Sequence, residues 1–449
     1  MNRALVRSLV YPLHERLRGR STMRFLREFR ATDTKTSADL ARWRLEKARR
    51  LIEHARRESP FYAEAFADRG LSADGLRSLD DLSRFPTIDK GLIRERLDDL
   101  VARDHRDRVF QLATGGSSGQ PLIFYTDKVR EASQLAAKLR AREWWGIRVG
   151  DHQVDLWGSP IELSAQDRFR AFKDGLLNQW VLSAFHLTDE AMAAYRDILA
   201  RRRADFLYGY ASVLARYARF LDARGENLHP LRMKGAISTA ELLLEPDREV
   251  IERVFGCPVI NEYGCRDGGY IAQTCPEGGL HIAADTVIVE ILSDDGNPLP
   301  PGEVGEVCVT NLWSFGMPLI RYRLGDTAAL VEAPCECGRP QPLLSRLGGR
   351  QTDTLITPDG RRIHGLGAMY VLRVLPAVES YQVIQEAPDH LRVLLVPQGQ
   401  PAEIDLEAPV RDGLAELMGE GVRIEVERVE AIPVLPSGKM RAIWNRLDG

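Results

Sequence analysis

Apolar residues recur at helical spacing along the first 85 residues of the chain. In LARWRLEKARRLIEHARRESPFY, residues 40–62, they return every three or four positions among arginines and glutamates. That period predicts amphipathic helices, and it returns over residues 129–145 and 188–222. We therefore expect a helical N-terminal region, residues 1–85, followed by further helices between shorter apolar runs.

Short apolar runs alternate with helical patterns in the middle of the chain. MKGAIS (233–238) and CPVINEYG (257–264) have the length and composition of strands, and LEPDREVIERVFG (244–256) between them has helical spacing. This alternation predicts layered α/β sheets. Residues 281–312 differ, because Gly, Pro and Asp separate their apolar runs. That pattern predicts an antiparallel β subdomain at about 281–345.

The last part of the chain, from Arg350 onward, has two β-rich stretches with intervening helical patterns. Its length is enough for a small α+β domain. The predicted fold class is thus α/β, with a large N-terminal domain of layered α/β sheets, residues 1–349, and a C-terminal α+β domain, residues 350–449.

Composition narrows the class of protein. The 449 residues carry a net charge of -3 with both signs mixed, which argues against a nucleic-acid partner. No apolar run approaches the length of a transmembrane helix. Six cysteines without an export signal indicate a reducing compartment, so we expect a cytoplasmic enzyme. The basic, amphipathic start, residues 1–20, is interpreted as a surface helix, with peripheral membrane contact as the alternative.

The stretch ATGGSSGQP, residues 113–121, has the composition of a phosphate-binding loop. Consecutive backbone N–H groups in such a turn form a concave anion site, and hydroxyl groups add donors. It is not a Walker A loop, because Gln120 and Pro121 follow Gly119 where that motif has Lys-Ser/Thr. By itself, the stretch is equally typical of a connector between two strands.

Five motifs in order resemble those of the adenylate-forming superfamily, which includes acyl-CoA synthetases, nonribosomal adenylation domains and luciferases. They are ATGGSSGQP, NEYGCRDGG, IRYRLGD, GGRQTD and LPSGKMR. A closer resemblance to the phenylacetate–CoA ligase branch, especially relatives associated with capsular polysaccharide genes, is carried by ISTAELL, PEGGLHI, PLIRYRLGD and CECGR. It covers nearly the whole chain. It implies an ATP- and Mg²⁺-dependent ligase that forms an acyl-adenylate with release of pyrophosphate, and a C-terminal domain that is mobile.

The resemblance also implies roles for single residues. Lys439 would stabilise the charge that builds up on the transferring phosphoryl group. Asp326 would accept the ribose hydroxyls, and Tyr263 would flank the adenine. The predicted catalytic residues are Lys439 and Asp267, and the predicted nucleotide-binding residues are Thr114, Gly115, Gly116, Ser117, Ser118, Gly119, Ser238, Thr239, Ala240, Glu241, Glu262, Tyr263, Gly264, Asp326 and Arg350. Two alternatives stay open: an exposed lysine at 439, and a helix N-cap at Ser238–Glu241.

The sequence departs from the family pattern at two places. Asp267, the predicted Mg²⁺ ligand, stands where the family has a longer glutamate, and Arg266 replaces a threonine. A shorter acid works with Mg²⁺ through water, since this ion keeps several waters. At the hinge motif, Thr352 stands where the pivot is usually Asp or Lys, with Asp353 next. The hinge is therefore assigned only as a segment.

Four residues have the types and spacing of a zinc site. Cys275 and His281 share one turn, and Cys335 and Cys337 form a C-x-C on another, which together can supply a tetrahedral Cys₃His set for a structural Zn²⁺. Relatives in the branch resemble this arrangement. The alternative is three free thiols and an unrelated histidine. Cys257 and Cys308 lie in apolar runs and are expected to be buried thiols.

The acyl pocket and the acceptor are the least determined features. Trp157, Tyr210 and Ala236 correspond to pocket-lining regions of relatives, although the same residues suit a core. The predicted partners are a small-molecule carboxylic acid and CoA as acceptor. Transfer to an amine, or a zinc-stabilised nucleotide-binding homologue without catalysis, stays open. The oligomeric state is also open, a homodimer included.

Overall fold

The computed structural model describes most of the chain. The described residues are 1–114, 122–157, 173–184, 187–350, 354–360, 362–364, 368, 371–372, 375, 378–397, 406–419, 421–433 and 442–447. The chain forms two compact units. The first consists of residues 1–114, 122–324 and 328–346, and the second of residues 115–121, 325–327 and 347–449.

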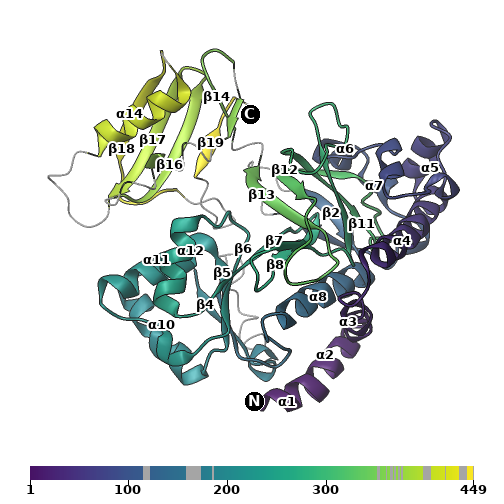
Figure 1. The fold of residues 1–449 in the computed structure, drawn as a ribbon, viewed down its shortest axis with the longest axis horizontal. Coiled ribbons are helices and arrows are strands. Elements are labelled where there is room, and N and C mark those ends of the chain that lie inside the picture. The colour runs from purple at the N-terminus through teal and green to yellow at the C-terminus, as the bar shows by residue number, and fades with distance from the viewer. Residues whose placement is uncertain are drawn as a thin grey trace. The chain divides into compact units, whose positions relative to one another are not determined.

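The first unit begins with a helical region, as the apolar spacing predicts (Figure 1). Its α-helices are α1 (Arg3–Leu5), α2 (Tyr11–Leu17), α3 (Thr22–Arg30), α4 (Ser37–Glu58), α5 (Pro60–Ala67), α6 (Lys90–Glu95) and α7 (Leu97–Leu100), with a π-helical turn at Val6–Val10 and 3₁₀ turns at Ala73–Gly75, Asp80–Arg84 and Arg103–His105. Local signals set the ends of these helices. Thr36 caps α4 by accepting the Asp39 N–H, and Pro60 begins α5, where no N–H is needed.

An eleven-stranded mixed sheet forms the centre of the first unit, in the order β10-β11-β12-β13-β9-β8-β7-β6-β5-β3-β4. The strands are β3 (Gln153–Trp157), β4 (Gln179–Ser183), β5 (Phe206–Tyr210), β6 (Gly235–Thr239), β7 (Val259–Cys265), β8 (Gly269–Thr274), β9 (Leu280–Ile282), β10 (Val287–Leu292), β11 (Gly305–Asn311), β12 (Tyr322–Val331) and β13 (Leu343–Arg350). Strands β4, β3, β5, β6 and β7 run parallel, whereas β8 is antiparallel to both β7 and β9, and β10 is antiparallel to β11. The strands of the predicted antiparallel region therefore belong to the same sheet as the parallel strands.

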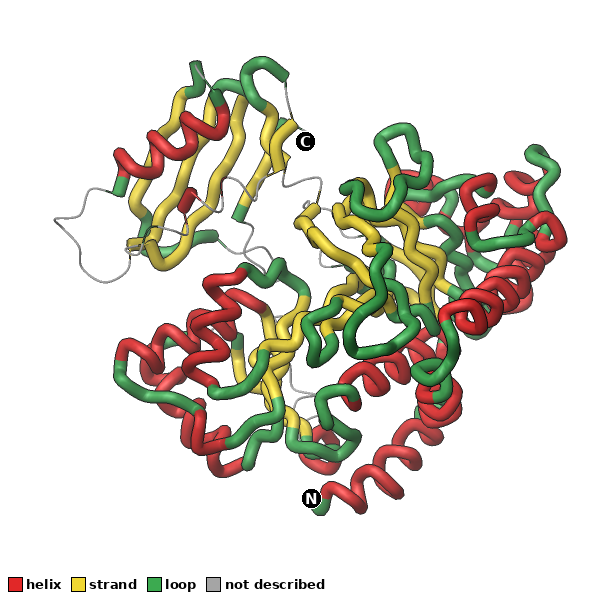
Figure 2. Tube along the Cα trace, in the orientation of Figure 1, coloured by secondary structure: helices red, strands yellow, loops and turns green. Residues whose placement is uncertain are grey.

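Helices cover both faces of the parallel strands (Figures 1 and 2). These helices are α8 (Lys128–Glu143), α10 (Asp189–Arg202), α11 (Ala211–Ala223) and α12 (Glu245–Phe255). Side chains alternate across the sheet, so Leu207 of β5 joins a hydrophobic cluster with Leu214 of α11. Its neighbour Tyr208 instead contacts Lys138 of α8 on the opposite face. The α/β class with a large mixed sheet is thus confirmed.

A two-stranded hairpin stands apart from this sheet. Strands β1 (Phe110–Ala113) and β2 (Ile123–Thr126) pair antiparallel, with Ala113 opposite Ile123. Thr114 and Leu122 close the hairpin, because Thr114 N–H donates to the Leu122 carbonyl and Leu122 N–H to Thr114 Oγ1, both at 2.9 Å. The two strands agree with the expectation that the Gly-rich stretch lies between two strands.

The second unit has its own sheet and core. Its elements are β14 (Thr354–Ile356), β15 (Arg362–His364), β16 (Val378–Ala387), β17 (His390–Pro397), α14 (Glu407–Met418), β18 (Arg423–Arg428) and β19 (Ile443–Asn445). The four-stranded sheet has the order β18-β17-β16-β19. Leu414 of α14 packs with Val393 of β17 and Ile424 of β18 in one hydrophobic cluster. This arrangement has the α+β secondary structure that the sequence of the segment predicts.

Membrane-spanning helices are absent from the described residues, where no helix combines the necessary length and apolarity.

Candidate active site and candidate metal centre

Four predicted site residues form one row across neighbouring parallel strands. Tyr210 of β5 is in register with Thr239 of β6, and Thr239 with Glu262 of β7. Trp157, the last residue of β3, stacks on Tyr210 with ring centroids 4.1 Å apart and planes at 18°. We call Trp157, Tyr210, Thr239 and Glu262 the strand-end row. In open α/β sheets, ligands bind at this edge, outside the carboxyl ends of the strands.

A buried charged cluster lies beneath one end of the row. Glu262 Oε1 is 2.8 Å from Lys138 Nζ of α8 and accepts a hydrogen bond of 2.9 Å from the Tyr208 hydroxyl. Arg142 approaches the other carboxylate oxygen at 3.8 Å. Burial opposes ionisation of Glu262, but Lys138 and Arg142 hold its pKa below the ordinary value. Burial likewise disfavours the Lys138 cation, yet Glu262 raises its pKa. Both groups are therefore charged at neutral pH.

This cluster is only partly satisfied by its own members. Within the described part of the chain, Glu262 Oε2, Gln273 Nε2 and Arg142 Nε are buried without a hydrogen-bond partner. Gln273 is directly opposite Glu262 in the β7–β8 register. Buried polar atoms are normally paired with protein, water or a ligand. The cluster thus retains hydrogen-bonding capacity at the end of the row.

The STAE segment, Ser238 to Glu241, ends strand β6. Ser238 and Thr239 belong to the strand, whereas the N-cap of α12 is Leu244, so the N-cap interpretation of this segment is wrong. Ala240 has a left-handed backbone, φ +65°, a conformation that costs energy in a residue with a side chain. Glu241 accepts a hydrogen bond of 2.9 Å from the Ser212 N–H at the start of α11.

Asp267 is buried and ionised. Burial raises its pKa, but the Tyr322 hydroxyl, 2.5 Å from Oδ2, and the positive charge of Lys90 outweigh that effect and lower it. Arg130 of α8 donates to the Asp267 backbone carbonyl. The neighbouring Arg266 donates to the Ala113 carbonyl at 2.8 Å. The NEYGCRDGG motif therefore lies beside the first strand of the Gly-rich hairpin.

Glycine is required at one position of the same motif. A Cβ atom on Gly264 would lie 2.5 Å from the Gly269 carbonyl oxygen across a β-bulge between β7 and β8. Tyr263, the predicted adenine neighbour, precedes this bulge and pairs with Ala272. The close approach of the two strands thus fixes the backbone next to Tyr263.

Other predicted residues lie outside the row or outside the described part. Ala236 is fully buried in the hydrophobic cluster with Leu207, on the sheet face opposite Thr239. Asp326 lies in β12, after Gly325 with φ +81°. The backbone of Arg350 ends β13, but its side chain is outside the described residues. Residues 115–119 of the loop, the hinge residues 352 and 353, and Lys439 also lie outside them. Their roles stay predictions.

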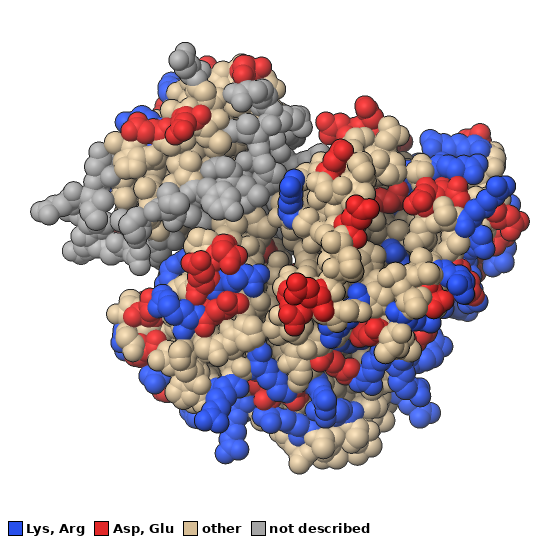
Figure 3. All heavy atoms as spheres, viewed as in Figure 1, with Lys and Arg blue, Asp and Glu red and all other residues tan. Residues whose placement is uncertain are grey.

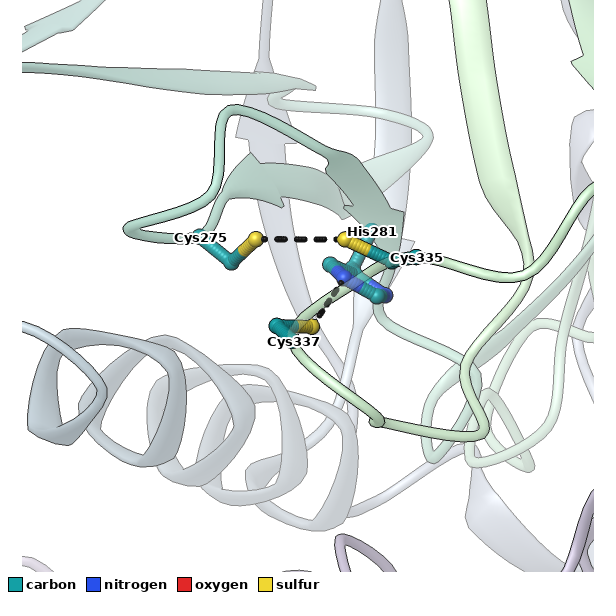
Figure 4. Close-up of side chains that lie close together, drawn as sticks. All are labelled: Cys275, His281, Cys335 and Cys337. Atoms are coloured by element: carbon teal, nitrogen blue, oxygen red, sulfur yellow. Dashed lines mark hydrogen bonds between the residues drawn. The ribbon is translucent and has the colours of Figure 1, made fainter.

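The four predicted metal ligands lie together (Figure 4). Cys275, His281, Cys335 and Cys337 place one ligand atom each within 4.8 Å of all the others. Cys275 Sγ is 3.6 Å from Cys335 Sγ, and His281 Nε2 is 3.1 Å from Cys337 Sγ. Strand β9 carries His281 between β8 and β13, and the turn between β12 and β13 carries the C-x-C. We call these residues the Cys₃His cluster.

The cluster fits a tetrahedral metal ion. Sulfur atoms bound to one Zn²⁺ at about 2.3 Å lie roughly 3.8 Å apart, close to the Cys275–Cys335 separation. His281 Nδ1 is 2.9 Å from the Gln341 carbonyl, so Nδ1 is the donor and Nε2 keeps its lone pair towards the thiols. A Cβ on Gly279 would lie 2.7 Å from Cys335 Sγ, so the turn makes room for this sulfur. Cys257 and Cys308 are buried elsewhere, as predicted.

Sequence reasoning missed the partners beneath the row. Lys138 and Arg142 belong to a helix whose pattern predicts only amphipathicity, and Tyr208 is one of several aromatic residues of β5. Lys138 contacts residues 70 and 124 positions away, and no local motif marks such a contact. The one sequence signal for Lys138 is its residue type, because lysine is rare in this chain compared with arginine.

Comparisons with known proteins agree with this fold. The family described as CapK C-terminal domain matches residues 355–446. CapK from Staphylococcus aureus is 26% identical over 417 residues, covering 91% of this chain and 90% of that protein. A phenylacetate-coenzyme A ligase from Thermus thermophilus is 26% identical over 401 residues, covering 86% and 84%. Indoleacetate–lysine synthetase from Pseudomonas savastanoi is 24% identical over 262 residues, covering 57% and 62%.

A solved structure also aligns over nearly the whole chain. It is a 2-hydroxyisobutyryl-CoA ligase in the postadenylation state with R3-HIB-AMP, with a TM-score of 0.74 and 19% identity, covering 93% of this chain and 92% of that chain. At this identity it shows the fold. In fold, the chain is similar to adenylate-forming ligases. In sequence, it is similar to CapK and to phenylacetate–CoA ligases.

Proposed function

We propose that this protein activates a carboxylic acid with ATP, releases pyrophosphate, and transfers the acyl group from the acyl-adenylate to CoA. The observation that carries the proposal is the strand-end row, with the Gly-rich hairpin beside the NEYGCRDGG motif through the Arg266–Ala113 contact. A ligand-binding sheet edge, with the strand that leads into the Gly-rich segment beside it, suits a bound nucleotide.

Different residues of the chain would bind the phosphates, the adenine, the ribose, Mg²⁺ and the acid. The backbone N–H groups of residues 115–119 and the Thr114 hydroxyl would bind the phosphates, Tyr263 and the STAE segment would bind the adenine, and Asp326 would bind the ribose. Asp267 would hold Mg²⁺, which supplies charge neutralisation on the phosphates. Its ionised state at neutral pH suits that role. Trp157 and Tyr210 present a stacked aromatic surface, which suits an aromatic or other apolar acid.

Lys439 would act from the C-terminal unit. It is the only lysine of residues 351–449. The ammonium group would stabilise the charge that grows as the carboxylate attacks the α-phosphate, and a hinge near Arg350 would bring it in and out. The Cys₃His cluster would bind a structural Zn²⁺ that ties the β8–β9 hairpin to the β12–β13 turn.

A screen of carboxylic acids for pyrophosphate release, with and without CoA, tests the proposal. We expect acid-dependent release, and thioester formation when CoA is added. The Lys439→Ala variant should lose acyl-adenylate formation by a factor of about 10² to 10³ while keeping most transfer from supplied acyl-adenylate. Arg411→Ala, which removes an exposed cation of α14, serves as the control. Equal loss of both half-reactions in Lys439→Ala would refute the two-position account.

Transfer to an amine is the second candidate. The similarity to indoleacetate–lysine synthetase favours it, since the name of that relative describes the joining of an acid to an amine. Turnover that requires an amine and ignores CoA in the same screen would establish this acceptor. The activation half-reaction would be unchanged.

A further inference from the structure

The N-terminal helix presents a row of exposed leucines. Leu5, Leu9, Leu13 and Leu17 recur every fourth residue from α1 through the π-helical turn to α2, and their exposed fractions are 45%, 57%, 51% and 79%. Of the nine exposed large hydrophobic residues in the described part of the chain, these four and Met1 are five. We call Leu5, Leu9, Leu13 and Leu17 the leucine stripe. Such a concentration of exposed apolar residues marks an interaction surface.

The opposite side of the same helix is firmly attached to the protein. Val6 and Tyr11 are buried in a cluster with Val149 and Leu177. The Arg3 carbonyl lies so close to Gly150 that a Cβ there would be 2.5 Å away. The N-terminal ammonium also donates to Asn178 Oδ1 at 2.7 Å. The helix therefore cannot bury its leucines by turning over without losing these contacts.

Positive charge surrounds the leucine stripe. Residues 1–30 contain eight arginines and two glutamates, in a chain whose net charge is -3. Arg3 and Arg7 pair with acids of the protein body. Arg16, Arg18, Arg24 and Arg27 are exposed and form no ion pair with the described residues. In Figure 3, Lys and Arg side chains gather along the lower edge, where Figure 1 draws α1 and α2.

A pocket of about 350 Å³ lies in this charged region. Arg16, Arg20 and Arg24 line it together with Pro12, Glu15 and Met23. Glu15 is paired with Arg20, at 2.5 Å, so the remaining guanidinium groups leave the pocket positive. Such a pocket suits a phosphate head group, while the adjoining leucines suit acyl chains.

We propose that this helix binds the protein peripherally to an anionic phospholipid surface, with the leucine stripe in the acyl boundary and the arginines at the head groups. The charge pattern favours lipid over a second copy of the chain. A symmetric contact through the stripe would bring the arginine-rich surfaces of two copies together, and like charges repel. The proposal is independent of the ligase activity.

Co-sedimentation with vesicles tests it. We expect the protein to bind vesicles of phosphatidylcholine mixed with phosphatidylglycerol, and to bind pure phosphatidylcholine vesicles much more weakly. Leu9→Gln/Leu13→Gln should lower the bound fraction on mixed vesicles by about tenfold or more. Arg16→Gln/Arg24→Gln should remove most of the difference between the two vesicle types, as should high salt. Val181→Gln/Val304→Gln, at two exposed sites elsewhere, is the matched control and should bind normally.

Analytical ultracentrifugation and thermal melting of the same variants complete the test. Unchanged melting midpoints would show that the exposed substitutions leave the fold intact. The proposal is overturned if the protein ignores mixed vesicles, or if the control variant loses binding as much as the leucine variant. A dimer that only Leu9→Gln/Leu13→Gln dissociates, without vesicle binding, would show instead that the stripe joins two copies.

Discussion

The Cys₃His cluster and the strand-end row belong to the same sheet, but their polar atoms are arranged in opposite ways. In the Cys₃His cluster, four ligand atoms converge within 4.8 Å of one another. Beneath the row, Lys138 and Glu262 neutralise each other at 2.8 Å, and unsatisfied atoms are spread over β7, β8 and α8. Convergent atoms suit one small ion, whereas dispersed atoms suit an extended polar molecule.

Removing a ligand of the Cys₃His cluster should have the largest effect on stability. Cys335→Ser should abolish the roughly one equivalent of zinc expected in protein purified without chelators. It should lower the free energy of unfolding of the first unit by at least about 5 kcal/mol, since binding free energy is folding free energy here. Metal analysis and thermal melting measure the two effects.

Cys257→Ala is the control, because Cys257 is a buried thiol that lies outside the cluster. It should keep the metal. The view that the cluster binds an ion, whereas the row binds a larger ligand, would be wrong in either of two cases. These are that Cys335→Ser keeps its full zinc, or that the unmodified protein contains none.

Breaking the charge pair beneath the row should have an intermediate effect. Glu262→Gln removes the buried carboxylate that pairs with Lys138 and approaches Arg142, so the free energy of unfolding should fall by about 2–4 kcal/mol. Lys138→Met/Glu262→Gln should be less destabilising than the sum of its single variants. Chemical denaturation measures both. Glu143→Gln, which breaks the exposed pair of α8 with Arg30, should cost less than about 1 kcal/mol. Equal costs for the two glutamates would contradict the view that the charged cluster beneath the row is buried and electrostatically coupled.

The two regions also differ in how far the sequence predicts them. The Cys₃His set could be predicted because each half is a short local motif, and only the order β13-β9-β8 was needed to join the two turns. Strands β6 and β7 and helix α12 followed from apolar spacing. Trp157 and Tyr210 were assigned by family resemblance, and their stacking depends on β3 and β5 being adjacent. The contacts of Lys138 follow from tertiary packing, which has no period in the sequence.

The smallest expected effect is on the pH dependence of stability, which should differ between the two regions. Burial, opposed by a hydrogen bond from Gln153, raises the pKa of Asp155 of β3 to about 6 from an ordinary value near 3.8. A carboxyl group with a raised folded pKa contributes stability that is complete below about pH 4 and is lost as the pH rises through about 6. Asp155→Asn should therefore remove this component and raise the free energy of unfolding at pH 7 by about 1–2 kcal/mol.

The stability that the Cys₃His cluster provides should change with pH in the opposite direction, because protons compete with metal for its ligands and acidification weakens metal binding. Denaturation should therefore be measured from pH 4 to pH 8. On acidification, the excess stability of Asp155→Asn over the unmodified protein should disappear, and so should the stability deficit of Cys335→Ser. An Asp155→Asn profile parallel to that of the unmodified protein would show that this carboxyl group does not titrate in that range.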